Sequence, residues 1–375
     1  MPMVLTSRTQ PSSKNQNFVV QGTLDGHRGA ILCLGTTEDG KFAASGGSDG
    51  TRIWNLETMA QISRPAVKGI RGWTTAVLWI RREDDAAEIL LYGTEQGYLV
   101  CWKQATPSSF EEIRVWRFAI RAEITALCFD AASNRLVVVN RASTLYSFAL
   151  NRDLSLRRLS VCGIADVVPK AVAFGDMKDQ ERQILVFGLF DGQVHTVHGS
   201  SIVGQRELGG MIGDASVNVG KGLFVIDDPH QGVGLYRIDD SRRLKTFEIP
   251  QTQENPRPRQ VCFADDAKLI VCGSDHGVAF VFDRWNEQIV DELYFGAADW
   301  LQTITAVDMN ESTMILGARS RDLQGSNKII VWRGARTKKP MEASAIWGYL
   351  VHVLNVIVGI AMFYYLSPYL PGLKH

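Results

Sequence analysis

Short apolar runs alternate with turns that contain Gly or Asp along most of the chain. The first complete unit has apolar runs at residues 31–34, 42–45 and 53–54, separated by the turns Glu38-Asp39-Gly40 and Ser48-Asp49-Gly50. Short runs of β-branched and aromatic residues bounded by such turns are typical of β-strands joined by hairpins. Because no sustained helical period occurs before residue 340, the pattern predicts an all-β fold and excludes an α/β fold.

The unit recurs seven times, and its third apolar run ends each time at a similar position. These end positions are Trp54, Trp102, Phe148, Val197, Tyr236, Phe282 and Trp332, spaced 39 to 50 residues apart. Repeats of this length predict a β-propeller, in which each repeat forms one blade. The fifth unit, residues 215–236, is the most degenerate, so six blades are the alternative to seven.

The first unit carries a motif that resembles the WD40 repeat. Gly26-His27, Ser45, Asp49 and Trp54 are similar to that family's Gly-His, Ser, Asp and Trp-Asp pattern, with Asn55 in place of the final Asp. The resemblance implies a WD40-like propeller over about residues 17–333. It also implies that His27, Ser45, Asp49 and Trp54 form a structural hydrogen-bond network within one blade. A hydrolytic triad of the same residue types is not favoured, because no Gly-x-Ser-x-Gly elbow occurs.

Strand counting predicts how the ring closes. The seventh unit supplies only three strands up to Trp332, and residues 333–339 have no strand pattern. Residues 18–24 do have one, so we expect them to form the missing outer strand of the last blade and remove an open edge. Residues 1–16 are rich in polar residues and Pro; we expect a disordered segment with no signal peptide.

Residues 345–366 form the longest apolar stretch. Twenty of these 22 residues are apolar, counting Gly, and none is charged. A helix of this length spans about 33 Å, enough for a hydrocarbon core of about 30 Å. The alternative is a core helix packed on the propeller, but a stretch that is apolar all round favours a transmembrane helix.

Charges beside this stretch predict its orientation. Arg333, Arg336, Lys338 and Lys339 lie in or next to the basic linker 334–344, whereas only Lys374 and His375 follow the span. The positive-inside rule therefore places the propeller in the cytosol and residues 367–375 in a short lumenal tail. The arrangement resembles a tail-anchored, single-pass protein, so we expect the endoplasmic reticulum or another endomembrane.

Charge and cysteine content narrow the function classes. Forty basic residues balance forty acidic ones, which excludes a globally basic nucleic-acid binder. The six cysteines show no CxxC pair and lie mostly in apolar runs, so we expect buried free thiols in a reducing compartment.

Candidate chemistry is sparse. No Walker loop and no His-Glu-x-x-His motif occurs, and we expect solvated turn positions for His195, His198, His230, His276 and the pair Asp227-Asp228. No catalytic residue, cofactor or metal site is predicted.

The strongest candidates for partner binding are the residues that enter each innermost strand, because they should ring the mouth of the central channel. They are Arg28, Arg71, Trp73, Arg121, Glu123, Lys170, Arg257, Arg259, Asp299 and Trp300. Arg and Trp are enriched in binding hot spots, and a mixed-charge rim suits a peptide or a protein loop. Alternatively, the tryptophans pack between blades and the charges are merely solvated.

These observations predict a non-catalytic, membrane-anchored scaffold that mediates protein–protein interactions at a cytosolic membrane face. The alternative is a guanine-nucleotide exchange factor, because a cytosolic WD40-like propeller with a C-terminal span resembles the endoplasmic-reticulum exchange factors for the small GTPase that starts coat assembly. A nucleotide-release assay on residues 1–340 separates the two.

Overall fold

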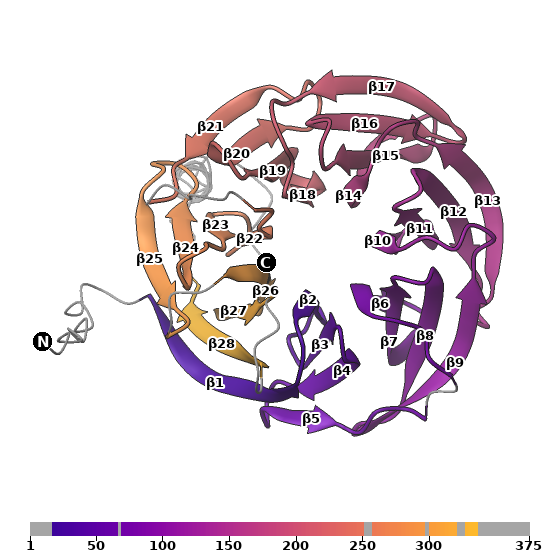
Figure 1. Cartoon of the computed structure of the whole chain (residues 1–375), viewed down its shortest axis with the longest axis horizontal. Helices are drawn as coiled ribbons and strands as arrows, with labels where there is room; N and C mark the ends of the chain where they lie inside the picture. The colour runs from indigo at the N-terminus through magenta and orange to yellow at the C-terminus, as the bar shows by residue number, and fades with distance from the viewer. Residues whose placement is uncertain (1–16, 67–68, 251–256, 297–299, 321–326, 337–375) are drawn as a thin grey trace, which may run out of the picture. The chain divides into compact units, whose positions relative to one another are not determined.

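The structure is a computed structural model that describes residues 17–66, 69–250, 257–296, 300–320 and 327–336. These residues belong to one compact unit, which ends at Arg336. They form seven four-stranded antiparallel sheets, the blades, arranged in a ring (Figure 1). The predicted seven-bladed β-propeller is therefore confirmed, and the fifth blade is complete.

Each blade runs from an innermost to an outermost strand. Blade 1 contains β2 (Ile31–Thr36), β3 (Phe42–Gly47), β4 (Gly50–Asn55) and β5 (Ala60–Ile62); blade 2 contains β6 (Thr74–Arg82), β7 (Asp85–Thr94), β8 (Tyr98–Thr106) and β9 (Ser109–Arg117). Blade 3 contains β10 (Ile124–Asp130), β11 (Arg135–Asn140), β12 (Thr144–Leu150) and β13 (Leu156–Gly163); blade 4 contains β14 (Pro169–Lys178), β15 (Glu181–Gly188), β16 (Gln193–His198) and β17 (Ser201–Glu207).

The remaining blades follow the same order. Blade 5 contains β18 (Asp214–Asn218), the short 3₁₀ turn η1 (Val219–Lys221), β19 (Leu223–Asp228), β20 (Gly232–Arg237) and β21 (Arg243–Phe247). Blade 6 contains β22 (Val261–Ala264), β23 (Leu269–Cys272), β24 (Val278–Asp283) and β25 (Ile289–Tyr294); blade 7 contains β26 (Leu301–Asp308), β27 (Ser312–Arg319), β28 (Asn327–Ala335) and β1 (Phe18–His27).

The N-terminal strand closes the ring, as predicted. β1 pairs antiparallel with β28 from Phe18 opposite Gly334 to His27 opposite Asn327. The backbone N–H of Phe18 also donates to the Asp291 carboxylate of blade 6 at 2.8 Å. The prediction that residues 333–335 lie outside the last strand is wrong, because β28 continues to Ala335. Arg333 and Gly334 pair with residues of β1 more than 300 positions away in the sequence, and Ala335 pairs with β27.

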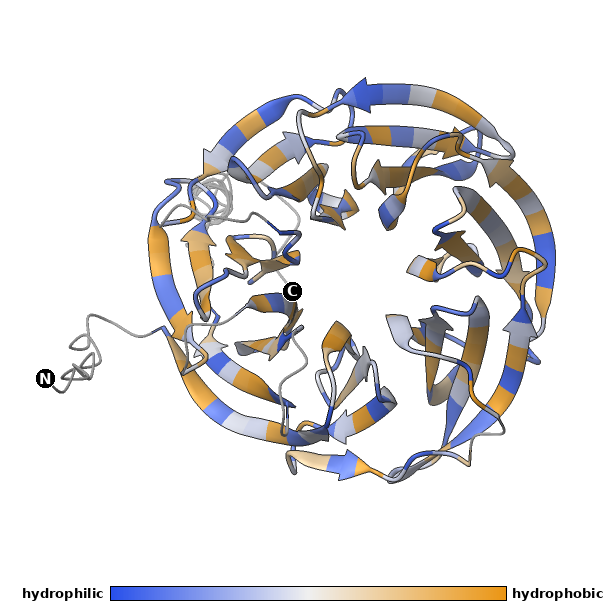
Figure 2. Cartoon of the chain, viewed as in Figure 1, coloured by the Kyte–Doolittle hydropathy of each residue, from blue (hydrophilic) through white to orange (hydrophobic). Residues whose placement is uncertain are grey.

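The hydrophobic core is divided among the blade interfaces. The described residues form seven apolar clusters, and each combines residues of two neighbouring blades. The second strands β3, β11 and β19 are buried along their whole length because a neighbouring blade covers each face. The outer strands instead alternate hydrophobic and hydrophilic residues (Figure 2). A blade alone would leave one apolar face exposed, so ring closure and core formation are coupled.

In six of the seven blades the outer strand has a bulge opposite the residue that ends the repeat; blade 1 is the exception. Trp102, for example, lies opposite Glu112 while its neighbour Cys101 lies opposite Arg114, so that Ile113 has no partner. The same register shift occurs opposite Phe148, Val197, Tyr236, Phe282 and Trp332. Such bulges bend an edge strand away from pairing with a further strand, which protects the rim of the propeller against edge-to-edge association.

Strand direction defines two faces. One face carries the blade-to-blade connections and the turns between second and third strands, and we call it the entry face. We call the opposite face the exit face. The chain leaves β28 on the exit face at Arg336, whose guanidinium pairs with Asp265 at 3.1 Å.

The predicted transmembrane helix 345–366, most of the linker 334–344 and the tail 367–375 lie outside the described residues. Within the described ranges, no helix is long and apolar enough to cross a bilayer. All six cysteines are free, as expected, and four of them are buried.

Candidate functional site

The four motif residues of blade 1 form one hydrogen-bond chain. The Nε2 atom of His27 lies 2.6 Å from the Ser45 hydroxyl, and the Trp54 indole N–H donates to the same oxygen at 2.7 Å. His27 Nδ1 lies 2.5 Å from an Asp49 carboxylate oxygen. His27, Ser45 and Trp54 are fully buried, and their network exposes no nucleophile. The expectation of a network within one blade is wrong, because His27 ends β1 of blade 7 whereas Ser45 and Trp54 lie on β3 and β4 of blade 1.

Burial and pairing set the protonation of this network. Desolvation lowers the pKa of His27 below 6.5 and outweighs the opposing effect of Asp49, so the imidazole is neutral near pH 7. Burial alone would raise the pKa of Asp49, but hydrogen bonds from His27 and Arg52 hold it well below its usual range. A neutral histidine fixed between a carboxylate and a hydroxyl serves the stability of the blade.

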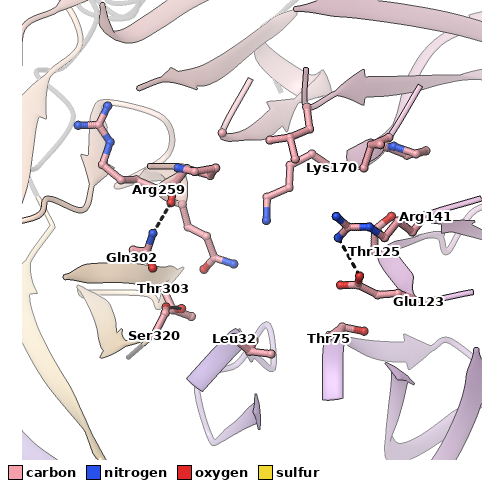
Figure 3. Close-up of a pocket in the computed structure, with 16 residues that line it drawn as sticks. Leu32, Thr75, Glu123, Thr125, Arg141, Lys170, Arg259, Gln302, Thr303 and Ser320 are labelled. Atoms are coloured by element: carbon pink, nitrogen blue, oxygen red, sulfur yellow. Dashed lines mark hydrogen bonds and ion pairs between the residues drawn. The ribbon is translucent and has the colours of Figure 1, made fainter. Parts of the chain in front are cut away.

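A cavity of about 260 Å³ opens at the entry end of the channel and is lined from all seven blades (Figure 3). In five blades the second residue of the innermost strand lines the cavity. These residues are Leu32, Thr75, Thr125, Lys170 and Gln302. The residue before each is buried between blades, so strand alternation turns the second side chain toward the channel.

Lys170 is the only charged residue at these five equivalent positions. Its ammonium group points into the open centre of the cavity (Figure 3), and no described residue forms an ion pair or hydrogen bond with it. The charge of Lys170 also acts on Asp214 at the start of β18. Desolvation raises the pKa of Asp214 to about 6, although the charge of Lys170 opposes that rise.

Arg259 corrects the sequence-based prediction. We expected an exposed rim residue, but its side chain is 2% exposed and pairs with the fully buried Asp227 at 2.6 Å. The Arg259 backbone N–H donates to the second Asp227 oxygen at 2.8 Å. Asp227 and Asp228 were expected in a turn and instead end β19, where both are buried. This pair ties blade 5 to the entrance of blade 6.

Arg71 also differs from the expected position. Its guanidinium makes two contacts of 2.5 and 2.8 Å with Glu112 of the outer strand β9, and the side chain is only 10% exposed. The residue therefore lies against the flank of blade 2. Glu123 does line the channel mouth, where its carboxylate pairs with Arg141 at 3.1 Å.

The other predicted rim residues lie on the entry face with varied exposure. Arg28, Arg121 and Arg257 are exposed, and Trp73 is 48% exposed. Arg257 stacks over the ring of Trp300, 4.6 Å from its centroid, and Trp300 is half-buried. Asp299 lies outside the described residues.

A shallow depression adjoins the channel mouth between blades 2 and 3. It is lined by Glu95, Gln96, Ala122, Glu123, Arg141 and Ala142 and shares Glu123 and Arg141 with the channel cavity. Two loops with exposed apolar side chains bound it. The Trp73 carbonyl accepts from the Glu95 N–H, and the Ile120 carbonyl accepts from the Ala122 N–H, each at 3.0 Å. Ile120 is 45% exposed. We call the channel mouth and this depression together the entry groove.

The described histidines outside the blade 1 motif do not gather at a second site. His195 was expected in a solvated turn but lies on β16, is 3% exposed and contacts Asp191 at 2.8 Å. His230 is exposed in the turn before β20. In the part of the chain that the structure describes, no group of three potential metal ligands occurs.

Sequence reasoning missed the neutral lining of the channel and the depression. Thr75, Thr125 and Gln302 belong to otherwise ordinary strands, and Ala122 and Ala142 carry no chemical signal. The second position of each innermost strand was the available clue.

Comparison with known proteins agrees with the fold. A family model for the WD domain, G-beta repeat, matches residues 18–55, which comprise β1 and blade 1 up to the end of β4. No curated protein matches the chain. The match and the seven blades together support a WD40-type propeller, a fold that suggests a protein-interaction scaffold.

Proposed function

We propose that this chain is a non-catalytic scaffold, anchored in a membrane by residues 345–366, whose propeller presents its entry face to cytosolic proteins. The observation that carries the proposal is the entry groove. Its polar channel mouth lies on the same face as the exposed side chains of Trp73, Ile120 and Arg121. Aromatic and arginine side chains around a recess are typical of protein-binding hot spots.

The membrane anchor rests on the uncharged apolar stretch itself, which is long enough to span a bilayer. The departure of the chain on the exit face supports an arrangement in which the entry face stays accessible. Tethering would raise the local concentration of bound partners at the membrane. The basic residues before the stretch favour a propeller on the cytosolic side of an endomembrane.

Affinity capture of the full chain from membranes tests the proposal. Three forms are compared: the wild type, a chain truncated before Ala345, and W73A. We expect the wild type to recover partners that W73A loses, and the truncated chain to recover fewer of them. The matched control is W285A, because Trp285 is similarly exposed, at 55%, but lies on the exit face. Equal recovery by wild type and W73A would contradict the proposal.

A further inference from the structure

The entry groove has two chemically different ends. At its inner end, Lys170 projects into the channel without an ionic partner among the described residues. The other cations of the channel lining, Arg141 and Arg259, are paired with Glu123 and Asp227 respectively. An incoming anion therefore meets one available ammonium group in a confined space, where a charge-assisted hydrogen bond is stronger than on an open surface.

Exposed apolar side chains flank the outer end of the groove. Trp73 and Ile120 stand on the two loops that bound the depression, and Ile70, on the same loop as Trp73, is 91% exposed. Ala122 and Ala142 lie among the lining residues of the depression between these loops, and their small side chains leave room for an incoming side chain. Exposed apolar residues gathered beside a recess mark an interaction surface.

The two ends belong to one continuous recess, because Glu123 and Arg141 line both the channel mouth and the depression. The recess is open along its length, which suits an extended chain better than a compact small molecule. A nucleic-acid backbone would need several available cations in a row, whereas this recess offers one.

We propose that the entry groove binds an extended protein segment with an acidic side chain seated against Lys170 and an apolar side chain held between Trp73 and Ile120. The segment lies radially, from the channel centre toward the gap between blades 2 and 3. This inference rests on the proposed scaffold function and adds the chemistry and the direction of the bound partner.

Selection of a random dodecapeptide display library on the purified full chain in detergent tests the inference. Wild-type protein should enrich peptides with Asp or Glu at a fixed distance from Leu, Ile or Phe. K170M should lose the acidic preference and bind the selected peptides about tenfold more weakly or worse, because a charge-assisted hydrogen bond is removed. K170E should enrich Lys or Arg at the same position.

Further variants keep the outcome interpretable. W73A should weaken the apolar preference and leave the acidic one, and W285A on the exit face should change neither. Thermal unfolding of each variant shows whether it is folded; if K170M is not, K170E and W73A still decide. The inference would be overturned if the wild type enriched no peptides, or if the enriched peptides lacked an acidic position. It would also be overturned if K170M kept the same acidic preference. Each of these outcomes leaves the proposed scaffold function to its own capture experiment.

Discussion

Arg259 and Asp227 form an ion pair of 2.6 Å in which both side chains are almost completely buried. They come from neighbouring blades, at the entrance of blade 6 and at the end of β19. Burial raises the pKa of Asp227 to about 6 even though Arg259 stabilises its charged form. Burying the two charges therefore costs desolvation free energy. The close geometry of the pair, with two further hydrogen bonds from Arg259 to Asp227, offsets that cost.

Removing one partner of this pair should be strongly destabilising. We expect D227A to cost about 3–5 kcal/mol, because it leaves the Arg259 charge buried without a counter-ion. The double variant D227L/R259M should cost clearly less than the sum of the single variants. Thermal unfolding of the full chain in detergent measures both. E123A is the control: Glu123 pairs with Arg141 at an exposed site, so the loss should stay within about 1 kcal/mol. Additive effects of D227L and R259M would contradict the account.

The hydrogen-bond network of blade 1 should make stability depend on acid. The folded-state pKa of His27 lies below its ordinary value of 6.5. The neutral imidazole therefore contributes fully to the free energy of unfolding above pH 6.5, and this contribution is lost as pH falls below that value. We expect H27Q to be less stable than the wild type by about 1–3 kcal/mol at pH 7.5, with the difference shrinking toward pH 5.

Asp227 has the opposite pH dependence because its pKa is raised: its contribution to stability is lost as pH rises from 3.8 through about 6. Both proteins contain Asp227, so the difference in unfolding free energy between wild type and H27Q isolates the contribution of His27. H230Q is the matched control, since His230 is exposed, and it should show no pH-dependent difference. A gap between wild type and H27Q that stays constant from pH 7.5 to 5 would count against the neutral buried imidazole.

Ring closure by β1 predicts a contrast between its two faces. Leu24 is fully buried between blades 7 and 1, whereas Val20 of the same strand is 57% exposed. L24A should lose about 2–5 kcal/mol, as large-to-small changes in a packed core do. V20A should stay within about 0.5 kcal/mol. Thermal unfolding of both variants measures the two losses. A loss of stability for L24A as small as that for V20A would mean that the strand is not an integral part of the last blade.

Much of this fold could be predicted from the sequence because its determinants are local and repeated. Trp54, Trp102 and Phe282 lie on third strands at regular spacing, and residues 18–24 were recognised as the missing strand. The extension of β28 to Ala335 could not be recognised, because Arg333 and Gly334 have no strand pattern of their own and become a strand by pairing with β1 and β27.

The candidate site was less predictable, because burial of its charges depends on distant partners. Asp227-Asp228 has the composition of a turn, and only an arginine 32 residues away in the sequence explains its burial. Arg259 was assigned to the rim because it precedes a strand, but its pairing with Asp227 buries it. Lys170 was identified, but its isolation in the channel emerges only when the lining from all seven blades is known.

The membrane anchor is a prediction with a simple test. We expect the full chain to remain with membranes after alkaline carbonate extraction, because an uncharged helix of 22 residues can span the hydrocarbon core. A chain truncated before Ala345 should appear in the soluble fraction. Extraction of the full chain by carbonate would contradict the anchor while leaving the propeller and its entry groove unaffected.

Site-specific photo-cross-linking in intact membranes shows whether protein partners bind at the entry groove. A photoreactive amino acid replaces Ile120 at the entry groove or Met177, which is 60% exposed at the exit end of β14. The account predicts that protein partners cross-link to position 120 and not to position 177, and that K170E removes the cross-links at 120. Equal cross-linking at both positions, or cross-linking confined to position 177, would contradict it.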